Sequence, residues 1–170
     1  YDLDEIREHM GGLGVNGVAL RFRGNEFAEG EFTGTREDVS RRSVQLCKDA
    51  ADACEALGGS VITIWLGFDG FDYPFQVDYE KNWDKIVRAF REVADYAGGK
   101  GLKVSIEYKP CEPRAFSMID GIGLTLQMID EVDRPNIGVT LDFCHMLMKR
   151  ENPAYSLALA ARKNKLYGLH

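Results

Sequence analysis

Several features that would assign this sequence to common classes of protein are scarce or missing. Its 4 cysteines are scattered and lack the close paired spacing of a zinc knuckle or a redox motif. No apolar run approaches the roughly 20 residues that cross a bilayer, and the first residues carry no basic segment of a signal peptide. We therefore expect reduced thiols and a cytoplasmic protein that has no membrane partner.

Positive charge is also in deficit. Lys and Arg number 21 against 27 Asp and Glu, which gives a formal net charge of −6. An acidic surface repels nucleic acid and anionic membranes, so both are poor partners, whereas neutral small molecules and cations are compatible with it. With 170 residues, 45% of them hydrophobic, the chain can bury a core of its own and fits a single domain.

One pattern repeats along the chain: an amphipathic stretch, a short glycine-rich hinge, and a β-branched apolar run that ends in polar residues. The run 61–64 shows no alternation, as expected for a parallel strand that is buried on both faces. The pattern predicts strands at 17–22, 60–65, 102–107, 137–142 and 166–170. It predicts helices at 3–10, from an N-cap at Thr35 to Leu57, and at 79–96, 121–132 and 153–162.

Five parallel strands alternating with helices indicate an α/β fold. We expect a parallel (β/α)8 TIM barrel, which usually needs about 250 residues for its eight strands. About five strands would then be present in a single domain over residues 1–170 that lacks the first and last strands of the barrel. An open parallel sheet is the alternative.

Polar side chains fall at the ends of the predicted strands. Trp65, Glu107, Asp142 and His170 are each the last or nearly the last residue of an apolar run. Active sites of parallel β/α folds gather at these strand ends, so we expect the four side chains to lie close together.

The apolar runs before Glu107 and Asp142 would bury the bases of both side chains, where an unpaired charge is costly and a metal ion would offset that cost. We predict Glu107, Asp142 and His170 as ligands of a divalent metal, Mn²⁺ first, with Mg²⁺, Co²⁺ and Zn²⁺ as alternatives. Taken singly, each carboxylate could instead cap the following helix.

Two segments resemble the xylose isomerases. Glu107–Arg114 (EYKPCEPR) is similar to the Glu-x-Lys-Pro-x-Glu-Pro-Arg segment of that family, and Leu141–His145 resembles its acidic residue followed three positions later by histidine. Ile64–Gly67 looks more like the rhamnose isomerase branch, and Gly168–His170 is similar to the strand that brings the metal-binding histidine in that branch and in tagatose-type epimerases. The chain is identified as a member of the xylose isomerase-like superfamily, closest in pattern to the rhamnose isomerase branch.

The resemblance implies a metal-dependent sugar isomerase that interconverts an aldose and a ketose by a hydride shift. It implies that Lys109 and His145 contact the substrate, with a second metal as the other role for His145, and that both act in catalysis with Glu107. Trp65 would form an apolar wall for the carbon face of a sugar. The alternatives are core packing for Trp65, a solvated charge for Lys109 and a surface position at the start of a helix for His145.

Other activities stay open. A ketose 3-epimerase would move a proton through an enediolate, although Lys109 favours the isomerase. A metal-dependent endonuclease acting at abasic DNA belongs to the same barrel family. The low number of histidines, 3, and the net charge of −6 both argue against this activity. A protein that keeps the fold as a binding module is a third reading. For the complete protein we expect a small-molecule sugar as the substrate and a homo-oligomer.

Overall fold

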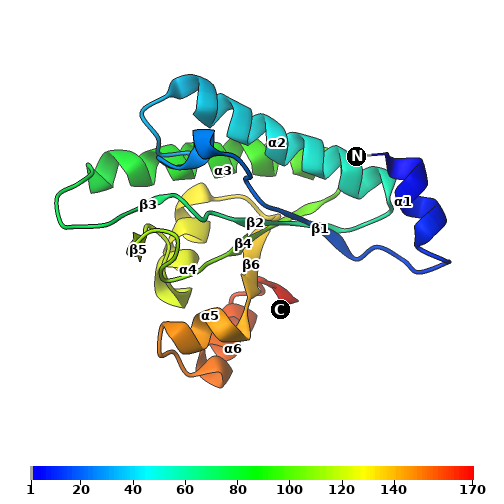
Figure 1. The fold of residues 1–170 in the computed structure, drawn as a ribbon. Helices are drawn as coiled ribbons and strands as arrows, with labels where there is room; N and C mark the ends of the chain where they lie inside the picture. The colour runs from blue at the N-terminus through cyan, green and yellow to red at the C-terminus, as the bar shows by residue number, and fades with distance from the viewer. Residues whose placement is uncertain (1) are drawn as a thin grey trace.

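The computed structural model describes residues 2–170, and a parallel five-stranded sheet forms its centre (Figure 1). The strand order is β1-β2-β4-β6-β7, so each strand lies beside the next strand of the same sheet along the chain. This is the order of a β/α barrel that has been opened between two strands. The strands are β1 Gly17–Leu20, β2 Val61–Trp65, β4 Lys103–Glu107, β6 Ile137–Leu141 and β7 Leu166–Leu169.

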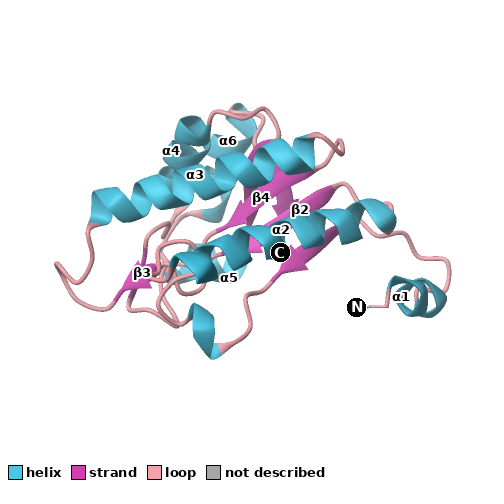
Figure 2. Cartoon of the chain, turned by 90° about the horizontal axis from the view of Figure 1, so that it is seen from above, coloured by secondary structure: helices cyan, strands magenta, loops and turns pink. Residues whose placement is uncertain are grey.

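Helices return the chain between the strands, which therefore all run in one direction. Figures 1 and 2 show α2 and α3 side by side over the sheet. Within residues 2–170, no helix combines the length and the apolar character that a membrane span requires. The helices are α1 Leu3–His9, α2 Glu37–Ala56, α3 Tyr79–Gly98, α4 Ile122–Val132, α5 Phe143–Met148 and α6 Pro153–Arg162, with a short 3-10 turn, η1, at Asn25–Phe27.

Local sequence explains where most of these helices begin and which face they bury. The carboxylate of Asp78 accepts a hydrogen bond from the N–H of Lys81 at the start of α3, and an apolar stripe on the same helix is buried. Asn152 caps α6 as predicted. The prediction of Thr35 as the N-cap of α2 is wrong: Arg36 holds that position, and the Thr35 hydroxyl donates instead to Glu29.

Two short elements have no counterpart in the sequence prediction. The two-residue strands β3 Gly70–Phe71 and β5 Phe116–Ser117 pair antiparallel and join the loops that follow β2 and β4. Helix α5 begins directly after β6, so that strand ends at Leu141 rather than at Asp142. Segments of two to six residues are too short to show a periodic pattern.

Candidate metal centre

Small hydroxyl side chains form a buried layer just below the strand ends. Thr63, Ser105 and Thr140 come from β2, β4 and β6, and Ser105 Oγ lies 2.6 Å from Thr140 Oγ1. Thr63 Oγ1 lies 3.4 Å from the same oxygen. Strand β7 approaches this layer so closely that a Cβ at Gly168 would lie 2.6 Å from Thr140 Oγ1. Because side chains alternate along a strand, the residues two positions further on face the same way.

Glu107 stands above this layer and is the centre of the site. It is only 2% exposed, and neither carboxylate oxygen has a hydrogen-bond partner within residues 2–170. Three nitrogen groups surround it: His170 Nδ1 lies 3.3 Å from Oε2, while His145 Nδ1 and Arg21 Nη2 lie 3.6 and 3.9 Å from Oε1. A buried carboxylate that accepts no hydrogen bond is costly to the folded state unless a cation neutralises its charge.

Two more side chains complete a cluster that fits a metal ion. Glu107, Asp142 and His145 each offer a ligand atom, and these atoms all lie within 4.8 Å of one another. His145 Nδ1 is buried and has no hydrogen-bond partner among the described residues. Carboxylate oxygens with an imidazole nitrogen suit a divalent first-row metal or Mg²⁺.

The three residues predicted as ligands differ in their positions. Glu107 and Asp142 belong to the cluster, whereas His170 reaches Glu107 from the end of β7 with 41% of its side chain exposed. The imidazole within the cluster is that of His145. Asp142 also caps α5, because one of its oxygens accepts from the N–H of His145 at 2.9 Å. The helix cap and the candidate ligand are therefore the same side chain.

Trp65 lies beside Glu107, opposite it in the register of β2 and β4. Its indole Nε1 is buried and has no partner within residues 2–170. The Arg21 guanidinium lies 4.7 Å from the ring centroid, and Lys109 Nζ lies 5.9 Å from it while donating to Glu112 at 3.1 Å. The structure thus places Trp65 and Lys109 close together and adds Arg21, which the sequence reasoning missed.

A second buried carboxylate, Glu31, is also missing from the sequence prediction. Glu31 Oε1 accepts from the N–H groups of Gly67 and Phe68 at 3.0 Å, and the nearby Asp69 accepts from the N–H and hydroxyl of Thr33 at 2.8 and 2.7 Å. Burial, followed by the charge of Asp69, raises the pKa of Glu31 to about 9. The raised pKa favours the protonated form of Glu31, and its hydrogen bonds together with those of Asp69 tie the loop after β1 to the loop after β2.

Comparison with known proteins gives a family and several relatives. The chain matches the family model described as xylose isomerase-like TIM barrel over residues 1–170. It is 28% identical over 153 residues to the xylose isomerase of Thermus thermophilus, a match that covers 88% of this chain and 40% of that protein. The chain therefore spans less than half the length of this relative.

Solved structures show the same fold. The D-allulose 3-epimerase of a Methylomonas species, in complex with D-allulose, superposes with a TM-score of 0.81 at 26% identity, over 99% of this chain and 56% of that one. The 3-keto-D-glucoside 4-epimerase of E. coli superposes with a TM-score of 0.82 at 18% identity, over 99% and 63%. At the lower identity only the fold is shared.

Proposed function

The chain belongs to the xylose isomerase-like TIM barrel family, and from this premise we propose that the whole protein is a metal-dependent sugar isomerase that interconverts an aldose and a ketose. The observation that carries the proposal is Glu107, a buried carboxylate with two unpartnered oxygens beside Asp142 and two histidines. The similarity to a xylose isomerase supports it. The closer relation to the rhamnose isomerase branch stays a prediction.

We assign the metal to Glu107, Asp142 and His145, with His170 approaching the other oxygen of Glu107. Mn²⁺ is our first choice, and Mg²⁺, Co²⁺ and Zn²⁺ are alternatives. When bound, such an ion polarises the carbonyl and the adjacent hydroxyl of an open-chain sugar. We also propose that the His145 imidazole contacts the sugar, as the family resemblance implies.

The neighbouring side chains hold the sugar. The Trp65 ring supplies an apolar face for the sugar carbons, and its unpartnered N–H can donate to a hydroxyl. Lys109, kept near the ring by Glu112, can donate to a second oxygen. Isomerisation moves a hydride from C2 to C1 and a proton from O2 to O1. The residues must therefore hold both oxygens in place throughout the reaction.

Ketose 3-epimerisation is the second candidate, and the similarity to a D-allulose 3-epimerase at 26% identity favours it. Epimerisation removes a proton from C3 and returns one to the opposite face. That proton passes through a basic side chain and can exchange with solvent, whereas a shifted hydride does not. The two candidates therefore differ in an isotope measurement as well as in their products.

The full-length protein should be incubated with Mn²⁺ in D₂O against a panel of aldoses, ketoses and 3-epimers, and the products read by NMR. We expect aldose–ketose conversion without deuterium at C1 or C2. Deuterium at C3 of an epimerised ketose would select the epimerase. Glu107→Gln is the control, and activity that survives it would refute the site.

A protein that binds Mn²⁺ but converts none of these sugars would refute the proposed function. Nicking of DNA containing abasic sites by the same preparation would then point to the endonuclease. The same result without nicking would favour a binding module.

A further inference from the structure

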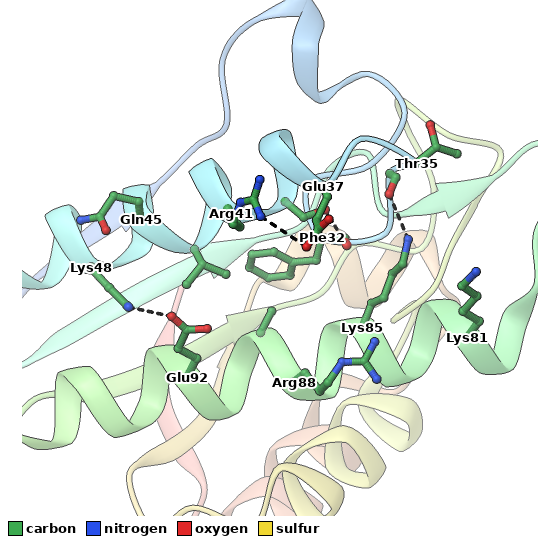
Figure 3. A pocket seen from close by; sticks show the side chains of 14 residues that line it. Phe32, Thr35, Glu37, Arg41, Gln45, Lys48, Lys81, Lys85, Arg88 and Glu92 are labelled. Carbon is green, nitrogen blue, oxygen red and sulfur yellow. Dashed lines mark hydrogen bonds and ion pairs between the residues drawn. The ribbon is translucent and has the colours of Figure 1, made fainter.

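A strongly basic groove of about 660 Å³ lies between α2 and α3 (Figure 3). None of its lining residues belongs to the candidate metal centre. In a chain with a net charge of −6, the groove reverses the local sign of the charge. The charged residues that line it are Arg41, Lys48, Lys81, Lys85 and Arg88, together with Glu37 and Glu92.

The two acidic residues are already paired with the cations of α2. Lys48 Nζ lies 2.7 Å from a carboxylate oxygen of Glu92, and Arg41 Nη1 lies 3.3 Å from one of Glu37. Figure 3 draws both interactions. The acidic residues of the groove therefore leave the cations of α3 unneutralised.

On α3, Lys81, Lys85 and Arg88 recur at helical spacing and face the groove. Lys81 and Arg88 form no ion pair within residues 2–170, and Lys85 donates only to the uncharged carbonyls of Thr33 and Gly34 at 2.9 and 3.0 Å. Burial, and then the charge of Lys81, lower the pKa of Lys85. Three like charges thus lie together, and none of them forms an ion pair among the described residues, although the charge of Asp69 acts on Lys85.

The remaining lining is mixed and suits a small organic anion. Val44 and Ala89 contribute apolar surface, and Ser40 and Thr35 carry hydroxyls. A phosphate group accepts several hydrogen bonds, and lysine and arginine are its usual partners in proteins. We propose that this groove binds a small phosphate monoester, with its phosphate on the α3 cations and its organic part against α2. This proposal is independent of the chemistry at Glu107.

Titration calorimetry of the full-length protein would test this proposal with glucose 6-phosphate, inorganic phosphate and glucose as probes. We expect glucose 6-phosphate to bind more tightly than phosphate, and glucose not to bind at the groove. Arg88→Gln should weaken binding of the ester about fivefold, the upper end for one exposed charge pair, and adding Lys81→Gln should weaken it at least about tenfold in total.

Arg162→Gln is the matched control, because Arg162 is also an exposed arginine of a helix and does not line the groove. It should leave binding unchanged, as should Glu107→Gln, which separates this site from the metal centre. Equal weakening by Arg88→Gln and Arg162→Gln would overturn the proposal. So would tighter binding of a short single-stranded DNA that depends on Arg88. Phosphate binding as tightly as the ester would refute the contribution of the organic part.

Discussion

Glu107 and Glu31 are both buried glutamates near the carboxyl ends of the strands, at 2% and 1% exposure, but their surroundings differ. Glu31 accepts from backbone N–H groups and lies beside Asp69, whose charge helps to raise its pKa to about 9. Glu107 accepts no hydrogen bond within the described chain and faces two imidazoles. The surroundings of Glu31 favour its protonated form, whereas Glu107 lies beside two imidazoles, the Arg21 guanidinium and the carboxylate of Asp142.

The difference shows how a structural acid can be distinguished from a metal ligand. Burial and the charge of a second carboxyl group favour the protonated form of a structural acid, and its backbone donors fix two loops. Imidazole nitrogens beside an unpartnered carboxylate offer lone pairs that can bind the same cation as the carboxylate oxygens. The four predictions below test this contrast, from the largest expected effect to the smallest.

Glu107→Gln removes the negative charge at the centre of the metal cluster. Metal affinity should fall by more than about 100-fold, beyond the cost of losing a supporting contact. Without metal, the stability of the variant should change by less than about 1 kcal/mol, because losing a buried charge is offset by losing its ion pair with Arg21. Denaturant unfolding with and without Mn²⁺ measures both effects, and a wild-type protein that gains no stability from Mn²⁺ would contradict the assignment.

Glu31→Gln should change how stability depends on pH. The folded carboxyl keeps its proton up to about pH 9, while the unfolded one releases it near 4.5, so the stability of the wild type falls as pH rises between these values. From pH 5 to pH 7 the wild type should lose about 3 kcal/mol relative to the variant. Parallel stability curves for the two proteins would show that Glu31 is ionised in the folded state.

Asp69→Asn should destabilise the protein at every pH. Two backbone N–H groups and one hydroxyl donate to Oδ1 of this carboxylate, and the uncharged oxygen of an amide would accept these hydrogen bonds more weakly. We expect a loss of about 2 kcal/mol. Asp72→Asn is the matched control in the same loop, since Asp72 is exposed and pairs with Arg114; an equal loss in both variants would remove the special role of Asp69.

Trp65→Phe should have the smallest effect. It keeps an aromatic ring but removes the unpartnered N–H together with part of the indole, so stability should fall only slightly while KM rises about fivefold for the lost hydrogen bond to the sugar. Trp83→Phe is the control, because the indole of Trp83 donates to Glu131 away from the site. Steady-state kinetics of both variants would show whether the Trp65 N–H reaches the substrate.

The strand-end part of the site could be predicted from the sequence because each functional residue directly follows an apolar run. This rule found Glu107, Asp142 and Trp65 and the parallel order of the strands. It missed Arg21, since the first strand was expected to continue to Phe22 and Arg21 therefore fell inside it, whereas β1 ends at Leu20.

Residues that meet through loops could not be predicted. Glu31 and Asp69 lie in different loops, and only the folded sheet brings those loops together. His145 was expected at the site from the family resemblance, but its place in the cluster beside Glu107 arises because α5 turns the chain immediately after Asp142. Such contacts depend on tertiary packing and leave no periodic pattern in the sequence.

The loops after the first three strands are bonded into one continuous collar. Glu31 accepts a hydrogen bond from the N–H of Gly67, and Asp69 accepts one from the N–H of Thr33. Strand β3 pairs with β5 and so joins the loop after β2 to the loop after β4. An engineer who grafts a single loop from a relative, in order to alter the proposed sugar specificity, would break hydrogen bonds that this loop makes with its neighbour. The exchangeable unit for altering specificity is therefore the collar as a whole, transferred together with its paired acids.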